Sequence, residues 1–128
     1  MKKQSAEWLA KAEGDIAAAE ALFRLGLPHR EIVCFHCQQA VEKYLKAYLD
    51  ENAVPIPHIH DLDSLLTLCI EHNNDFSALD RYQIASLTDF AVEYRYPTSL
   101  ATPEEDETKR FVALAKEVGA FLSVRLSR

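Results

Sequence analysis

The stretch from residue 30 to residue 51, REIVCFHCQQAVEKYLKAYLDE, decides the predicted fold. When successive residues are placed 100° apart around a helix, its apolar side chains gather on one arc that covers nearly half the circumference. A helix with so broad an apolar arc is expected at the centre of a helical bundle. The residues on that arc are Val33, Cys34, Cys37, Ala40, Val41, Tyr44, Leu45 and Tyr48.

The opposite arc of the same segment is polar, with one exception. Phe35 lies there among charged residues, which indicates a second contact surface, formed with another helix or another chain. We predict that Phe35, Gln39 and Glu42 lie at such an interface. Lys43 and Lys46 share this face and could meet the phosphate of a nucleotide or of RNA. A merely solvated face is the third alternative for these residues, and for His36 beside them.

Apolar spacing and helix-end signals elsewhere predict four further helices. The first runs from about residue 6 to residue 25, where Gly26 and Pro28 end it. A short third helix follows, with Asp61 as its N-terminal cap, and ends near residues 73–74.

The last two helices also have start signals. A capping box formed by Ser77 and Asp80 predicts a fourth helix to about residue 94, ended by Pro97. Thr102 is the predicted N-cap of the last helix, with Pro103 in its first turn.

Composition agrees with an all-α fold in one domain, residues 1–128. The chain has only 3 Gly and 5 Pro, too few turn-forming residues for a sheet of many strands. Its net charge is -6, which argues against broad, non-specific binding of nucleic acid. It contains no apolar run of about 18 residues and no apolar segment after the basic start, so we expect a cytoplasmic protein without a membrane span.

Two motifs could suggest a metal or redox site. Cys34 and Cys37 have CxxC spacing, but both fall on the apolar arc, so core packing is the favoured interpretation. His58, His60 and Asp61 could supply metal ligands, although a polar loop with Asp61 as a cap is favoured. We therefore expect neither a metal nor a cofactor.

Three segments together resemble the HEPN family (higher eukaryote and prokaryote nucleotide-binding). They are Cys34-Phe-His-Cys-Gln-Gln-Ala-Val-Glu-Lys-Tyr-Leu-Lys46, His60-Asp-Leu62 and Tyr94-Arg-Tyr-Pro97, and the resemblance extends from about residue 7 to residue 122. It implies an antiparallel, up-and-down bundle of about five helices that forms a homodimer, with Tyr96 at its interface. Many relatives act with a minimal nucleotidyltransferase as a toxin–antitoxin pair.

The resemblance also implies where catalysis would lie. Catalytic members of the family are metal-independent ribonucleases with an Arg-x4–6-His motif that is paired across the dimer. Arg95 matches the arginine, but positions 100 to 102 hold Leu100, Ala101 and Thr102, which cannot exchange a proton near neutral pH as imidazole does. Residues 103–107 are strongly acidic, which would repel a phosphodiester.

These residues lead to ranked functional predictions. We expect a dimeric HEPN-like module that partners a minimal nucleotidyltransferase and is not an enzyme by itself. In such a module, we expect Arg95 to bind a phosphate or a carboxylate of the partner through its guanidinium. The alternative is a salt bridge that closes its own loop. The alternatives are a divergent ribonuclease, in which Arg95 works with His36 or His60, and nucleotide or RNA binding without chemistry through Lys43, Lys46 and Arg95.

Overall fold

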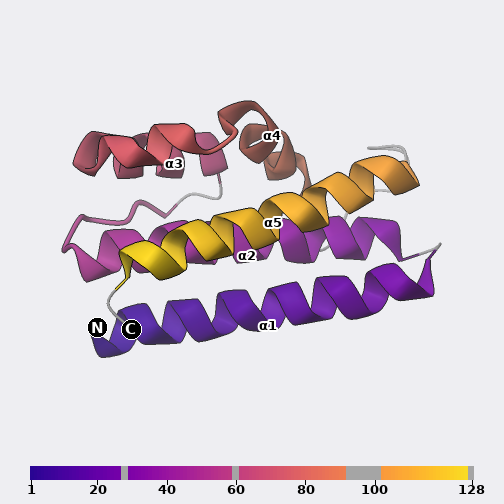
Figure 1. Ribbon diagram of the computed structural model, residues 1–128, viewed down its shortest axis with the longest axis horizontal. Coiled ribbons are helices and arrows are strands. Elements are labelled where there is room, and N and C mark those ends of the chain that lie inside the picture. Colours follow the sequence, from indigo (N-terminus) through magenta and orange to yellow (C-terminus); the bar gives the residue numbers. More distant parts are fainter. Residues whose placement is uncertain (27–28, 59–60, 92–101, 127–128) are drawn as a thin grey trace.

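Two long antiparallel helices form the base of the computed structural model, which describes residues 1–26, 29–58, 61–91 and 102–126 (Figure 1). Helix α1 spans Lys3–Leu25 and α2 spans Arg30–Glu51. The predicted bounds of α2 are confirmed, whereas α1 begins three residues earlier than predicted. Gly26 ends α1 with a φ of 74°, a left-handed value that glycine adopts without steric cost.

Shorter elements cover the side of α2 that faces away from α1 (Figure 1). They are α3 at Leu62–His72, the 3-10 helix η1 at Asn74–Ala78, α4 at Arg81–Ser86 and the 3-10 helix η2 at Leu87–Phe90. Asp61 caps α3 as predicted, because its Oδ1 accepts from the backbone N–H of Asp63 at 3.1 Å.

The fourth predicted helix is interrupted. The α-helical part is only six residues long and passes into η2. Leu87 and Phe90 are both buried there, since residues three apart share one side of a 3-10 helix. The predicted capping box is also wrong. Asp80 is itself the N-cap and accepts from the Gln83 N–H at 3.1 Å, while Ser77 lies in η1 and donates to the carbonyl of Asn74.

The last helix, α5, spans Glu105–Arg125 and lies along α2. The predicted cap at Thr102 is wrong, because the helix begins after Glu104, which makes no side-chain cap hydrogen bond. Pro103 precedes the helix and is buried, and its carbonyl accepts from the Arg30 guanidinium at 3.4 Å. A tertiary contact thus joins Pro103 to α2 just before α5 starts.

The all-α architecture is confirmed for the described residues, but the direction of α5 departs from strict up-and-down alternation. Arg30 contacts Glu105 at one end of the pair, and Tyr44 contacts Gly119 further along, so α2 and α5 run in parallel. The chain returns to the same end of the bundle through α3, η1, α4 and η2 (Figure 1).

Helix α2 lies at the centre of the core, as predicted. Its apolar arc is buried along its whole length, between α1, α5, α3 and η2. Close packing on α5 depends on Gly119, because a Cβ there would lie 2.7 Å from the Tyr44 hydroxyl. No helix in the described part of the chain is long and apolar enough to cross a membrane.

Candidate functional site

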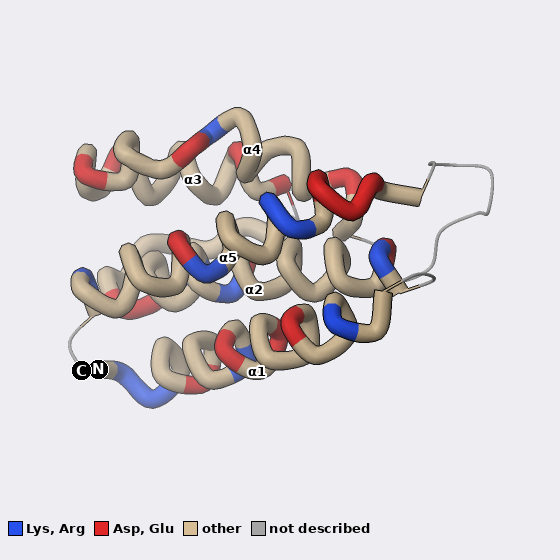
Figure 2. The backbone as a smooth tube through the Cα atoms, turned by 45° about the vertical axis from the view of Figure 1, so that its right-hand side comes forward, with Lys and Arg blue, Asp and Glu red and all other residues tan. Residues whose placement is uncertain are grey.

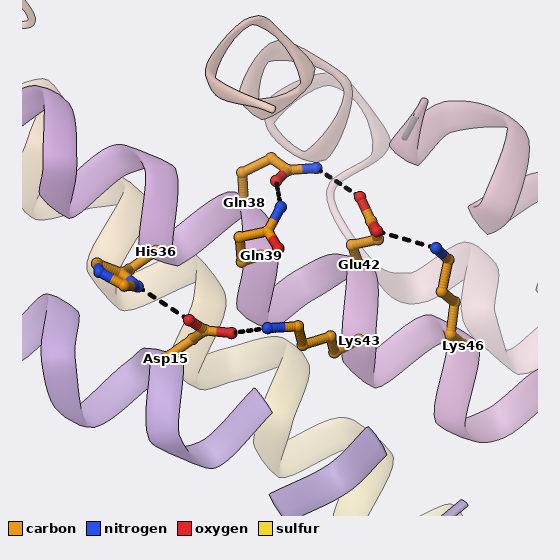
Figure 3. A network of polar contacts seen from close by, with 7 residues as sticks. All are labelled: Asp15, His36, Gln38, Gln39, Glu42, Lys43 and Lys46. Atoms are coloured by element: carbon orange, nitrogen blue, oxygen red, sulfur yellow. Dashed lines mark hydrogen bonds and ion pairs between the residues drawn. The ribbon is translucent and has the colours of Figure 1, made fainter. Parts of the chain in front are cut away.

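The polar side of α2 carries two networks of charged and amide side chains (Figure 3). In the first, Asp15 of α1 lies between two residues of α2. Its Oδ1 is 2.9 Å from His36 Nδ1, and its Oδ2 accepts from Lys43 Nζ at 2.6 Å. Because both carboxylate oxygens are engaged, Asp15 joins α1 to α2 at two points two helical turns apart.

The second network runs along α2 itself. The Gln39 amide donates to Gln38 Oε1 at 2.6 Å, and Gln38 Nε2 donates to Glu42 Oε1 at 2.9 Å. Lys46 Nζ then donates to Glu42 Oε2 at 2.9 Å and lies 5.4 Å from the centre of the Trp8 ring of α1. The ammonium is thus held by a carboxylate and by an aromatic face.

Of the alternatives for the polar side of α2, a solvated face does not hold for Glu42 and Lys46. Glu42 is 4% exposed and Lys46 is 8% exposed, and the Trp8 ring of α1 lies against the Lys46 ammonium. Gln38 is fully buried and was missed by sequence reasoning. A buried charge needs a partner, and the spacing of Glu42 and Lys46 by four residues was the available signal.

The start of α2 presents apolar side chains away from the core. Phe35 is half-buried, with its ring edge-on to that of His36 at 5.4 Å between centroids. One turn earlier, Ile32 is 48% exposed, and Leu25 at the end of α1 is exposed as well. Phe35 therefore belongs to an apolar surface that also includes Ile32. The three-residue spacing between them in the sequence was the signal that could have revealed Ile32.

Comparison with known proteins identifies the family. The sequence model of the HEPN domain matches residues 5–125. The chain belongs to the HEPN family. Its fold is similar to the crystal structure of ST0689, described as an archaeal HEPN homologue, with a TM-score of 0.72 and 19% identity over 99% of this chain and 100% of that one. No curated protein sequence matches the chain.

The residues predicted from the resemblance to match the catalytic motif of the HEPN family lie mostly outside the described residues. Arg95 and Tyr96 lie outside the described residues, as do Leu100, Ala101 and His60. Thr102 is described and exposed. The acidic run after it leads into α5, whose first turn is red in Figure 2. Glu104, Glu105, Asp106 and Glu107 line a hollow together with Arg110. This end of the HEPN domain therefore has a local negative potential.

The two lysines predicted to contact phosphate already have acidic partners. Lys43 is paired with Asp15, and Lys46 is paired with Glu42. Lys43 retains partial exposure, so its ammonium can still donate to an anion at the surface. Lys46 would have to leave both Glu42 and the Trp8 ring, which makes it the weaker candidate for binding phosphate.

The cysteines belong to the core of the HEPN domain, as predicted. Cys34, Cys37 and Cys69 are each 0% exposed. Burial raises the pKa of the Cys37 thiol far above its ordinary value, and it raises the pKa of Cys69 to about 12. Both thiols stay protonated and unreactive at neutral pH. Among the residues that the structure describes, no cluster of three His, Cys, Asp or Glu side chains could hold a metal ion.

Proposed function

We propose that this HEPN chain is a single cytoplasmic domain, residues 1–128, that works as a homodimeric module with a separate minimal nucleotidyltransferase in a toxin–antitoxin-type system. The observation that carries the proposal is the apolar surface at the start of α2, where Ile32 is exposed beside Phe35. Family membership supports the same conclusion.

The composition of this surface suits a protein partner. Ile32, Phe35 and Gln39 recur at three- and four-residue steps, so they form one stripe along α2. An apolar stripe that ends in a hydrogen-bonding amide is typical of an interface core with a polar edge. A two-fold axis beside α2 would bring the same stripe of a second copy against it.

The other residues assigned to the interface take different parts in this proposal. Gln39 and Tyr96 would contact the second copy directly. Glu42 is buried, so it would act through its hydrogen bond to Gln38, which in turn accepts from Gln39 and fixes the orientation of that amide. Glu42 would therefore shape the interface without touching the partner.

The dimer makes the first testable prediction. Ile32→Arg should weaken self-association by roughly thirtyfold or more, about 2 kcal/mol, because a charge would be buried in the apolar stripe. Mass measured in solution at micromolar concentration checks this. Val124→Arg is the matched control, since Val124 is an exposed apolar residue on α5 and its replacement should leave the dimer intact. A monomeric wild-type protein would refute the homodimer.

The nucleotidyltransferase partner is tested separately. If the neighbouring open reading frame encodes a small protein with the Gly-Ser and Asp-x-Asp signature of a nucleotidyltransferase, the two chains should co-purify when they are expressed together. Ile32→Arg in the same experiment shows whether the complex requires the HEPN dimer. Failure of the two wild-type chains to associate would argue against a direct complex.

One observation favours a second function, a divergent ribonuclease in which Arg95 works with a non-standard histidine. His36 is bound to a carboxylate through one ring nitrogen, an arrangement that general bases use. If this function is correct, RNA incubated with the purified protein is cleaved, and Arg95→Ala abolishes the cleavage.

A further inference from the structure

We propose that Asp15 of α1 is a positioning residue for the contact between two copies of the chain, and that it acts through the rings of His36 and Phe35. This inference rests on the proposed homodimer and adds to it a residue that lies outside the stripe of Ile32, Phe35 and Gln39. It is carried by two consecutive contacts, one from Asp15 to His36 and one from His36 to Phe35.

The first contact restrains the imidazole of His36. Asp15 Oδ1 lies 2.9 Å from His36 Nδ1, while Oδ2 accepts from Lys43 Nζ at 2.6 Å (Figure 3). Because the bond to Lys43 holds the carboxylate in place, its other oxygen gives the imidazole a fixed partner. The Asp15 side chain is only 12% exposed. Asp15 therefore restrains the ring from within the domain and offers little surface to a second copy.

The second contact passes this restraint to Phe35. The centroids of the His36 and Phe35 rings are 5.4 Å apart and their planes are inclined by 68°, which is an edge-to-face arrangement. Neighbouring residues of a helix project about 100° apart, so their side chains normally diverge. At least one of the two rings must therefore lean along the surface of α2 toward the other. An imidazole held by Asp15 provides the Phe35 ring with a fixed surface to pack against.

The advantage for a dimer lies in conformational entropy. A half-buried phenylalanine such as Phe35 loses rotamer freedom when a partner packs on it, and this loss opposes association. A ring that is already held in its bound orientation loses less freedom. Asp15 thus strengthens the dimer without contacting the second copy.

The other two members of the stripe are restrained in different ways. Ile32 is β-branched, so its χ1 angle has one strongly preferred value in a helix. The Gln39 amide is held by Gln38, whose Oε1 accepts from it at 2.6 Å. Phe35 has neither a branched Cβ nor a hydrogen-bonding group, so its ring depends on packing such as that which the imidazole provides.

A general loosening of the domain is the competing explanation, since Asp15 also joins α1 to α2. A double-mutant cycle separates the two roles. Phe35→Leu keeps an apolar side chain in the stripe but removes the ring pair with His36. If Asp15 acts through Phe35, the effect of Asp15→Ala on the dimer disappears in the Phe35→Leu background, whereas a general loosening acts in both backgrounds.

The dissociation constant of the dimer is measured by sedimentation equilibrium for the wild type, both single variants and the double variant. Asp15→Ala should raise this constant roughly fivefold, the size of one lost edge-to-face pair, and less than about twofold in Phe35→Leu. Glu20→Ala is the matched control, because Glu20 is another acidic residue of α1 and pairs with Lys116 of α5 at 3.3 Å. It should leave the dissociation constant unchanged.

Two further variants guard against an unfolded Asp15→Ala. His36→Ala removes the intermediate ring and should give the same pattern in the cycle. Asp15→Asn keeps a side chain that can form a hydrogen bond to the imidazole, so it should retain most of the affinity. Thermal melting identifies the variants that are folded at the temperature of the measurement.

A second measurement does not depend on the dimer. In Ile32→Glu, whose charge should keep the chain monomeric, NMR couplings and nuclear Overhauser contacts should show Phe35 in one χ1 rotamer against the His36 ring. Adding Asp15→Ala should average the rotamers of Phe35.

The proposal is overturned by equal effects of Asp15→Ala in the two backgrounds, by an equally large effect of Glu20→Ala, or by a Phe35 ring that is averaged in the presence of Asp15. A wild-type chain that is monomeric at every concentration refutes the homodimer and, with it, the role of Asp15 in association. The NMR measurement still shows in that case whether Asp15 holds the ring, so the two failures are distinguishable.

Discussion

Phe76→Ala is expected to lower the free energy of unfolding by about 3–5 kcal/mol, the largest effect of any single truncation that we predict. Phe76 is fully buried in η1. Its ring centroid lies 4.5 Å from that of Tyr48 on α2 and 5.0 Å from that of Phe121 on α5. Alanine would leave a cavity where three elements meet. Urea unfolding followed by circular dichroism measures the change.

Two variants make this prediction specific. Phe76→Leu retains much of the volume and should lose clearly less stability than the alanine variant. Tyr82→Ala is the surface control, because Tyr82 of α4 is 86% exposed and should change stability by no more than about 0.5 kcal/mol. Equal losses for Phe76→Ala and Tyr82→Ala would show that η1 does not close the core.

Glu42→Ala is expected to cost about 3 kcal/mol of stability, the second large effect. Lys46 would keep its charge in a buried position without the carboxylate at 2.9 Å, and Gln38 would lose the hydrogen bond that it donates to Glu42. Removal of one member of a buried ion pair is costly because the other charge stays desolvated. Chemical denaturation at neutral pH provides the measurement.

The double variant Glu42→Leu/Lys46→Met isolates the cause. Apolar replacement of both partners removes the unpaired charge, so it should recover much of the stability that Glu42→Ala loses. If the double variant is as unstable as Glu42→Ala, the loss of stability comes from altered packing against Trp8 and not from the unpaired ammonium of Lys46.

The central part of the fold was predictable from sequence because it depends on local signals. The apolar arc of α2, the glycine stop of α1 and the Asp61 cap each act within a few residues, and all three are confirmed. The start of α5 was not predictable in this way. Thr102 and Pro103 have good capping chemistry, but α5 starts at Glu105, and the Pro103 carbonyl before it accepts from Arg30 of α2, a contact that no local signal predicts.

The candidate site was less predictable than the fold. A helical wheel places His36, Lys43 and Lys46 on the polar side of α2, but it contains no information on what another helix brings there. Asp15 and Trp8 reach this side only because of the register of α1 on α2, which is set by packing along both helices. The sequence therefore identifies His36 as a candidate, but it does not reveal that the carboxylate of Asp15 contacts its ring.

The sealed thiols of Cys34, Cys37 and Cys69 have a practical consequence for dynamics. None of the three sulfurs is accessible to solvent in the folded chain. A disulfide reagent can therefore react with these thiols only when the structure around them opens transiently. Cys34 lies on the α5 side of α2, where its Sγ is 3.9 Å from Thr108 Oγ1, and Cys69 belongs to α3. The rates at which these native cysteines react with the reagent therefore report how often the two parts of the bundle open.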